Sequence, residues 1–246
     1  MIDPTTRCLT GHFIGVGVGP GDPELLTLKA LRLIRQASVV CYLTNAQGHS
    51  QSRAIAAEAF RDANSQQLEL AIPMPFATDR TLANKAYDAG AQAIRAQLDA
   101  GREVVFICEG DPLFFGSFAY LLERLQGRYA CQVVPGISSV HAAAAALQRP
   151  LTRLKESMVV LSGRHDDAQI RQALLDHDTV VLMKGGRARP RILALLAETG
   201  RSADARYLEY IGRETEHIEA DVTQLVAEPG PYFSLFVVTR SAQEHR

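Results

Sequence analysis

The chain has 246 residues, which is enough for a well-buried core in one large or two small domains. Hydrophobic residues make up 47% of it and charged residues 22%, as in an ordinary soluble globular protein. Because 26 Lys and Arg side chains balance 27 Asp and Glu, the formal net charge of -1 argues against a general nucleic-acid binder. An acidic ligand must therefore be held by a local basic cluster.

The N-terminus, MIDPTTRCLTG, lacks the basic start and apolar core of a signal peptide. No later run approaches the roughly 18 apolar residues of a membrane helix, so we expect a cytoplasmic protein without a membrane partner. The four cysteines, Cys8, Cys41, Cys108 and Cys131, are far apart in sequence, and the last three lie in apolar runs. This pattern predicts buried, reduced thiols and no metal site, since no zinc spacing is present.

Short runs rich in Val, Ile and Phe alternate with longer helical patterns along the whole chain. The predicted strands are Phe13 to Gly17, Ser38 to Leu43, Gln67 to Ile72, Val104 to Cys108, Cys131 to Val134, Met158 to Ser162, Thr179 to Met183, Ala205 to Tyr210 and Phe233 to Thr239. The predicted helices are Pro23 to Gln36, Ser52 to Phe60, Leu82 to Ala100, Ser117 to Gln126, Ser138 to Leu147, Ala168 to Asp176 and Pro190 to Thr199. Such alternation favours an α/β architecture with mainly parallel sheets.

Nine strands exceed what a single small sheet usually carries, so we expect two α/β domains. The polar segment LQGRYA interrupts the pattern and predicts a boundary there, with an N-terminal domain of residues 1–126 and a C-terminal domain of residues 127–246. Near the end of the chain, a polar stretch and a Pro-Gly-Pro turn precede an apolar strand. This order predicts an antiparallel strand at the edge of the second sheet, which makes that sheet mixed and the first mainly parallel.

A glycine-rich stretch, HFIGVGVGPGDPELLTLKA, joins the first predicted strand to the first predicted helix. The dinucleotide fingerprint G-x-G-x-x-G needs a third glycine, but its two possible registers meet Pro20 or Asp22 there. The second strand also runs into Asn45 where an acid would bind a ribose. A nucleotide-dependent oxidoreductase is therefore disfavoured. Asp22 instead predicts a helix N-cap, followed by Pro23 at the first helical position and Glu24 in the first turn.

Ligands of open α/β sheets bind at the carboxyl ends of strands, and three loops at such ends are unusual. In EGDPLFFGS, Gly110 permits a positive φ, Asp111 lies beside it, and Phe114 with Phe115 offers an apolar wall. A plain turn with two core aromatics is the alternative. In PGISSVHAAAAAL, two hydroxyls open a helix, and a capping serine alone also explains them.

The third loop, KGGRARPR, holds Lys184, Arg187, Arg189 and Arg191 within eight residues, the densest basic cluster in the chain. A solvated helix start is the alternative interpretation. The sequence contains no phosphate-binding loop, no nucleophile elbow and no H-E-x-x-H motif, so hydrolase and kinase chemistry lack their usual residues. These loops point to a small organic cofactor held largely by backbone groups.

Taken together, GVGVGPGDPELLTLKA, CEGDPLFFGS, VVPGISSVHAAAAALQRPL and VVLMK resemble the tetrapyrrole methylase family. Members of that family use S-adenosylmethionine to methylate uroporphyrinogen and corrin precursors, and S-adenosylhomocysteine is the product. The match extends from Gly15 to about Val238. It implies two α/β domains with a ligand cleft between them, a small tetrapyrrole substrate and a homodimer. The glycine-rich loop then faces substrate and cofactor, and Asp22 is tolerable because the methyl donor carries a sulfonium cation and no phosphate.

The resemblance also implies site residues. In the family, positions that contact the cofactor match Pro20, Glu109, Gly110, Asp111, Phe114, Ser138, Ser139, Met183, Ile211, Ser234 and Leu235, with Ile211 standing where the family usually has Gly or Ala. The substrate's carboxylates need cations, and the candidates for substrate contact are Asp22, Lys184, Arg187 and Arg189. No catalytic residue is assigned, because the sulfonium is itself a strong electrophile and alignment should supply much of the acceleration.

Overall fold

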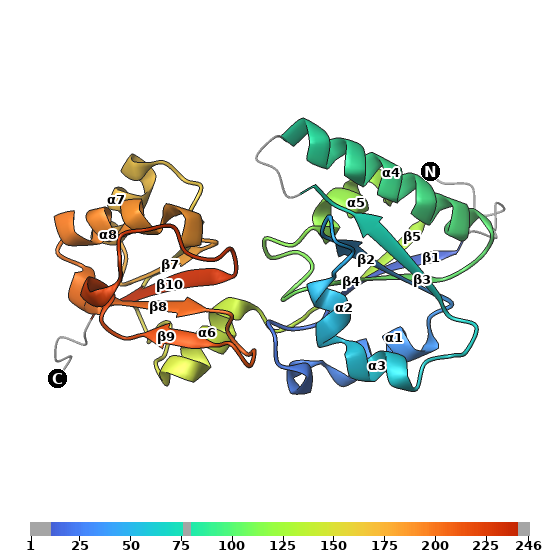
Figure 1. The fold of residues 1–246 in the computed structure, drawn as a ribbon, viewed down its shortest axis with the longest axis horizontal. Coiled ribbons are helices and arrows are strands. Elements are labelled where there is room, and N and C mark those ends of the chain that lie inside the picture. Colours follow the sequence, from blue (N-terminus) through green and yellow to red (C-terminus); the bar gives the residue numbers. More distant parts are fainter. Residues whose placement is uncertain (1–10, 76–79, 241–246) are drawn as a thin grey trace. The chain divides into compact units, whose positions relative to one another are not determined.

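The structure is a computed structural model that describes residues 11–75 and 80–240 (Figure 1). The chain divides between Ser138 and Ser139 into two compact units. Each unit contains one five-stranded sheet, the first wholly parallel and the second mixed, so the predicted α/β class and both sheet types are confirmed. Cys8 lies outside the described residues, whereas Cys41 and Cys108 are buried free thiols and Cys131 is a half-buried one.

The first sheet has the strand order β3-β2-β4-β1-β5, and each neighbouring pair is parallel. Its strands are β1 (His12–Gly17), β2 (Val39–Thr44), β3 (Leu68–Pro73), β4 (Val104–Cys108) and β5 (Ala130–Val134). β5 pairs with β1, with Ala130 opposite His12. The expected boundary between residues 126 and 127 therefore falls before a strand of the first sheet, because the LQGRYA segment is a turn inside this unit and not a linker.

Helices cover both faces of the first sheet. α4 (Arg80–Asp99) and α5 (Phe118–Leu125) pack on one face, and α1 (Leu28–Gln36), α2 (Gln51–Ile55) and α3 (Ala57–Arg61) pack on the other (Figure 1). Successive residues of a strand point to opposite faces, so every residue of β4 is buried in one of the two layers. This explains why the strands read as continuous apolar runs instead of alternating ones.

The predicted first helix is divided in two. The Asp22 carboxylate accepts a hydrogen bond from the Glu24 backbone N–H at 2.8 Å, so the predicted cap is confirmed, but it starts only a 3-10 turn, η1 (Pro23–Leu25). α1 has its own cap, because the Thr27 hydroxyl accepts from the Ala30 N–H at 3.1 Å. The predicted helix over residues 52 to 60 is likewise divided, into α2 and α3.

The second sheet has the order β6-β7-β10-β8-β9. Its strands are β6 (Met158–Ser162), β7 (Thr179–Met183), β8 (Ala205–Glu209), β9 (His217–Glu219) and β10 (Ser234–Thr239), and only β6 and β7 are parallel to each other. β10 is antiparallel as predicted, but the expected edge position is wrong. Its Leu235 pairs with Met183 on one side and Leu208 on the other, which makes β10 the central, buried strand. β9 was not predicted, because its three residues are mostly polar and too few to show the pattern typical of a strand.

The second unit begins with α6 (Ser139–Leu147). The core of this unit lies between the second sheet and two helices, α7 (Asp167–Asp176) and α8 (Arg189–Glu198). Tyr207 and Phe236 are the largest fully buried side chains of this core. Short 3-10 turns complete it: η2 (Gly186–Ala188), η3 (Ser202–Asp204) and η4 (Val222–Gln224). In the part of the chain that the structure describes, no helix combines the length and apolarity needed to cross a membrane.

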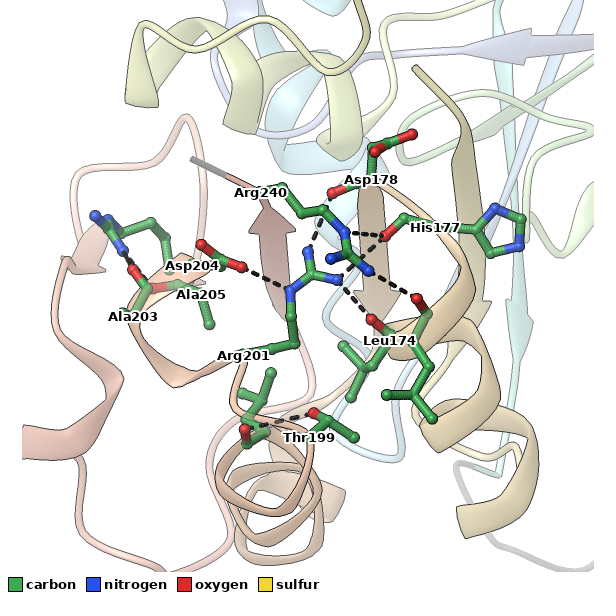
Figure 2. Close-up of polar contacts among 12 residues, drawn as sticks. Leu174, His177, Asp178, Thr199, Arg201, Ala203, Asp204, Ala205 and Arg240 are labelled. Atoms are coloured by element: carbon green, nitrogen blue, oxygen red, sulfur yellow. Dashed lines mark hydrogen bonds and ion pairs between the residues drawn. The ribbon is translucent and has the colours of Figure 1, made fainter. Parts of the chain in front are cut away.

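Two arginines cap the carboxyl end of α7 (Figure 2). The side chain of Arg201 is only 5% exposed; it donates to the carbonyl oxygens of Leu174 and Asp178 at 2.5 and 3.1 Å and to the Asp204 carboxylate at 2.6 Å. Arg240 donates to the Leu175 carbonyl at 2.7 Å. Cations suit this end of a helix, because its last carbonyl groups have no partner within the helix.

We expect Arg201→Ala to lower the free energy of unfolding by about 3 kcal/mol, because it removes a buried guanidinium that donates to the half-buried Asp204 carboxylate and to the carbonyl groups at the end of α7. Urea unfolding measures this loss. Arg171→Ala is the control, since Arg171 also pairs with a carboxylate, Glu198, at 2.6 Å but lies on the surface. Equal unfolding midpoints for the two variants would contradict a stabilising role for Arg201.

Candidate active site

The carboxyl ends of β1, β4 and β5 lie side by side at one edge of the first sheet. The loops that follow β1 and β4 pair with each other: the Gly110 N–H donates to the Gly19 carbonyl at 2.7 Å, and the Val18 N–H donates to the Cys108 carbonyl at 3.0 Å. Both glycines have positive φ, 83° for Gly19 and 65° for Gly110. This pairing joins the glycine-rich loop to the loop after β4, residues 109–117, which we call the EGDP loop. The two loops are far apart in sequence.

Three glycines bring these loops into backbone contact. A Cβ atom added to Gly136, in the loop after β5, would lie 2.1 Å from the Gly110 carbonyl oxygen and 2.8 Å from the Gly17 Cα. A Cβ on Gly17 would lie 2.4 Å from the same oxygen. Any side chain at Gly17 or Gly136 would therefore push the three loops apart. Gly17 of the glycine-rich stretch therefore serves backbone packing between the loops.

Gly15, the first glycine of that stretch, has a different role. A Cβ here would lie 2.4 Å from the Phe118 ring, which packs across β1 and stacks on Phe13 with ring centroids 5.2 Å apart. Gly15 thus lets the start of α5 approach the sheet. Because α5 follows the EGDP loop directly, the Phe118 ring also fixes where that loop ends.

Asp111 braces two of the loops. One of its carboxylate oxygens accepts from the Leu113 N–H at 2.9 Å, and the other accepts from the Gly136 N–H at 3.1 Å.

Burial, together with the negative charges of Glu109 and Asp111, raises the pKa of the Cys108 thiol well above its usual range. Cys108 is therefore a neutral core residue and no nucleophile.

The cofactor-contact candidates of the first unit all lie along this edge. Pro20 and Ser138 are buried, whereas Glu109, Gly110, Asp111 and Phe114 are half-buried. The sequence predicted their loops but missed Gly17 and Gly136, whose role depends on contacts between distant segments. Ser139 is the first residue of α6 and belongs to the second unit.

The cofactor-contact candidates of the second unit lie near one edge of the second sheet, where β7 and β8 end. Met183 ends β7 beside Leu235 of β10, and Ser234 pairs with Glu209 at the end of β8. Ile211 is buried two residues after β8 ends. The Ser234 hydroxyl donates to the Pro231 carbonyl at 2.8 Å, so this side chain anchors the loop before β10.

The basic loop after β7 does not act as one cluster. Lys184 is half-buried with its Nζ 5.7 Å from the centre of the Tyr232 ring, and Arg187 is exposed. Arg189 has a side chain only 14% exposed; its Nε donates to the Glu228 carbonyl at 2.6 Å, and its Nη1 lies 3.4 Å from the Glu209 carboxylate.

Arg191 points toward the loop after β6, where it donates to the carbonyl oxygens of Gly163 and His165 at 2.7 and 2.9 Å. It also forms an ion pair with Asp167. Arg189 and Arg191 therefore hold neighbouring segments of the second unit together. Of the four basic side chains of this loop, Arg187 is the exposed one.

Two residues without a glycine's freedom have left-handed backbones directly after strands: Lys184, after β7, with φ 56° and Tyr210, after β8, with φ 51°. Phe115, with φ 55°, lies in the loop between β4 and α5. Such conformations cost about 1 to 3 kcal/mol each and concentrate at functional sites. The sequence did not predict these left-handed conformations, because nothing in the identity of the three residues indicates a positive φ. Over residues 11–75 and 80–240, His, Cys, Asp and Glu form no group that could hold a metal ion.

Comparison with known proteins decides the family. The sequence profile of the tetrapyrrole (corrin/porphyrin) methylases matches residues 12–226. The chain belongs to this family. The methylase is 36% identical over 234 residues to a precorrin-2 C(20)-methyltransferase of Sinorhizobium sp, covering 93% of this chain and 95% of that protein. It is 30% identical to the cobalt-precorrin-2 C(20)-methyltransferase of Salmonella typhimurium, covering 94% and 98% of the two chains.

Solved structures share the fold of the methylase. A cobalt precorrin-4 methyltransferase, CbiF, has a TM-score of 0.72 at 20% identity, over 97% of this chain and 98% of that one. A uroporphyrin-III C-methyltransferase of Thermus thermophilus, complexed with S-adenosylhomocysteine, has a TM-score of 0.65 at 24% identity, over 94% and 98% of the chains. At these identities the likeness concerns the fold alone.

We expect Gly136→Ala to destabilise the methylase by about 3 kcal/mol, because the new methyl group meets rigid backbone on two sides. Chemical denaturation measures the effect. Gly90→Ala is the matched control: its Cβ would meet side-chain atoms of Ile72 and no backbone, at 2.8 Å from Cδ1 and 3.0 Å from Cγ2, and alanine favours a helix such as α4. A similar loss of unfolding free energy in the two variants would contradict the destabilising effect of the backbone contact.

Proposed function

We propose that this methylase transfers a methyl group from S-adenosylmethionine to C20 of precorrin-2, which gives precorrin-3A in cobalamin biosynthesis. The observation that carries the proposal is the 36% identity to a precorrin-2 C(20)-methyltransferase, which extends over nearly the full length of both chains. The motifs EGDPLFFGSF and PGISSVHAAAAAL, together with a chain of this length, favour the same enzyme.

The residues at the two sheet edges fit the methyl donor. The first edge offers backbone groups, the carboxylates of Glu109 and Asp111 and the ring of Phe114. The loops after β1 and β4 contain no Lys or Arg over residues 18–22 and 109–117. Carboxylates and an aromatic ring suit a ligand that carries positive charge and no phosphate. We assign Pro20, Gly110 and Ser138 of the first unit to the methyl donor. Met183, Ile211 and Leu235 of the second unit stay predictions for cofactor contact.

The reaction needs little from side chains beyond positioning. When bound, S-adenosylmethionine would supply an electrophilic methyl group, which an electron-rich meso carbon can attack so that S-adenosylhomocysteine leaves with the electrons of the S–CH3 bond. The role of the chain is to hold the two reactants in line: the backbone contact of Gly17, Gly110 and Gly136 fixes the loops, and Asp111 braces them. This rigidity supports catalysis by alignment, without a dedicated nucleophile.

The substrate's carboxylates need cations near the sheet edges. We assign Lys184 and Arg187 to them, because Arg187 is exposed and Lys184 directly follows β7 in the same loop. Asp22 stays a prediction for substrate contact, although its carboxylate also caps η1. The expected cytoplasmic location and the homodimer likewise stay predictions.

A cobalt-loaded substrate is the second candidate, and the 30% identity to a cobalt-precorrin-2 C(20)-methyltransferase favours it. In that reaction the tetrapyrrole itself carries the metal, so the chain needs no metal ligands. Uroporphyrinogen III is a more distant candidate.

Incubation of the purified protein with S-adenosylmethionine and precorrin-2 should yield a product heavier by one methyl group, with the new carbon at C20 by NMR. Parallel reactions with cobalt-precorrin-2 and uroporphyrinogen III separate the three candidates. Calorimetry should detect binding of S-adenosylhomocysteine. No methyl transfer to any of the three substrates would overturn the proposed activity.

Removing Lys184 and Arg187 should weaken substrate binding selectively. We expect Lys184→Gly with Arg187→Ala to raise the KM for the tetrapyrrole roughly tenfold or more, with unchanged affinity for S-adenosylhomocysteine. Lys155→Gly with Arg153→Ala is the control, because it removes the same charges from an exposed loop before β6, at the opposite edge of the second sheet. Normal KM values in the first double variant would exclude the two cations from the site.

A further inference from the structure

The carboxylates of precorrin-2 need more cations than the loop after β7 provides. A tetrapyrrole precursor carries carboxylates around the whole rim of a large ring, whereas Lys184 and Arg187 lie close together in one loop. Two neighbouring side chains contact only one part of such a rim. Methyl transfer also requires the reacting carbon to lie within about 3 to 3.5 Å of the donated methyl group. The rim of the ring therefore reaches elements beside the proposed donor site in the first unit.

Few cations of the first unit lie at the edge where its strands end. Helices that connect parallel strands run back along the sheet, so their first turns lie at that edge. Within the described residues, the loops after the five strands and the first turns of the helices that follow them contain three Lys and Arg side chains: Lys29, Arg53 and Arg80. Arg53 pairs with the Glu69 carboxylate at 2.7 Å. Lys29 belongs to α1, whereas Arg80 begins α4, which packs with α5 on the other face of the sheet.

Arg80 is an exposed side chain that an aromatic ring holds in place. Its Cζ atom lies 4.7 Å from the centre of the Tyr120 ring, and the Tyr120 hydroxyl raises the pKa of Arg80, so the guanidinium keeps its charge. Tyr120 is the third residue of α5, which starts directly after the EGDP loop, and its ring packs on Tyr87 with centroids 4.9 Å apart. A guanidinium over a ring loses rotational freedom, yet N–H groups at its edge can still donate.

Arg80 differs from the other arginines that lie over rings in the first unit. Each of these others also pairs with a carboxylate: Arg53 with Glu69, Arg124 with Asp88 and Arg128 with Asp99. Among the residues that the structure describes, Arg80 forms no ion pair with an acidic side chain. Its guanidinium is thus available for a carboxylate that the chain itself does not supply.

We propose that Arg80 binds a carboxylate on the rim of the tetrapyrrole, and that Tyr120 is a positioning residue that holds the Arg80 guanidinium for this contact. This inference rests on the proposed function. A guanidinium binds a carboxylate through two parallel N–H···O hydrogen bonds, so the contact orients the ring beside the EGDP loop as well as strengthening its binding. Arg80 therefore contributes to binding of the substrate and not of the methyl donor.

The test measures binding of precorrin-2 in the presence of S-adenosylhomocysteine, so that no methyl group is transferred. Arg80→Ala should raise the dissociation constant of precorrin-2 roughly fivefold or more, with that of S-adenosylhomocysteine changed less than about twofold and the urea midpoint unchanged. Arg80→Lys keeps the charge but not the two parallel donors, so its dissociation constant should lie between the two.

Arg102→Ala is the matched control. It also removes one exposed arginine, but this residue follows the carboxyl end of α4 and lies at the opposite edge of the first sheet, just before β4. The Arg102 side chain donates only to the side chain of Gln97, at 2.9 Å, among the contacts of the described residues. This variant should bind precorrin-2 and S-adenosylhomocysteine as the unaltered protein does.

A double-mutant cycle tests the role of Tyr120. Tyr120→Leu removes the ring and should weaken binding of precorrin-2 in the unaltered background but change it little in the Arg80→Ala background, because the ring acts through Arg80. Tyr120→Phe keeps the ring and should bind precorrin-2 nearly as tightly as the unaltered protein. Equal effects of Tyr120→Leu in the two backgrounds overturn the role assigned to Tyr120.

A normal dissociation constant of precorrin-2 in Arg80→Ala overturns the inference. So does an equal loss of S-adenosylhomocysteine affinity, which would assign Arg80 to the cofactor. Methyl transfer by the unaltered protein together with normal binding by Arg80→Ala rejects the inference alone. Tight binding of precorrin-2 without methyl transfer rejects the proposed activity alone, and no binding of precorrin-2 to the unaltered protein rejects both.

Discussion

The contact among Gly17, Gly110 and Gly136 is the constraint on which the site in the first unit depends. Parallel strands bring the loops after β1, β4 and β5 to one edge, but only residues without a Cβ let their backbones touch. Asp111 then ties two of these loops together through backbone N–H groups. The edge is consequently built from main-chain groups and carboxylates. This composition suits a cationic, phosphate-free ligand, and it explains why a glycine-rich strand-to-helix turn here is no dinucleotide fingerprint.

The second unit shows how a basic run in sequence is divided by the fold. Lys184 and Arg187 precede α8, whereas Arg189 and Arg191 lie in its first turn. Residues two positions apart on a helix point in different directions, so Arg189 reaches Glu209 and Arg191 reaches Asp167. Two of the four charges therefore stabilise the unit. The other two, Lys184 and Arg187, are the ones that we propose for the carboxylates of the substrate.

Left-handed residues alone do not mark the site. Gln148 and Leu154 also have positive φ, yet they lie in the connection between α6 and β6. Lys184 and Tyr210 differ because each directly follows the carboxyl end of a strand, where ligands of α/β sheets bind, and Phe115 lies in the loop after β4. The strain there is offset by stable surroundings: two core layers on the first sheet, and in the second unit a core reinforced by Arg201 at the end of α7.

The sequence alone determined the α/β class, all but one of the strands, the cap at Asp22 and the loops that carry the candidate site. These features depend on neighbours within a few residues: hydrophobic period, turn residues and helix caps. Only the tertiary structure decided that β5 belongs to the first sheet, that β10 is central in the second, and which arginines face inward. It also decided the left-handed turn at Phe115 and the meeting of Gly17 with Gly136. Each of these depends on contacts between segments far apart in the chain, and no local pattern of residues encodes such contacts.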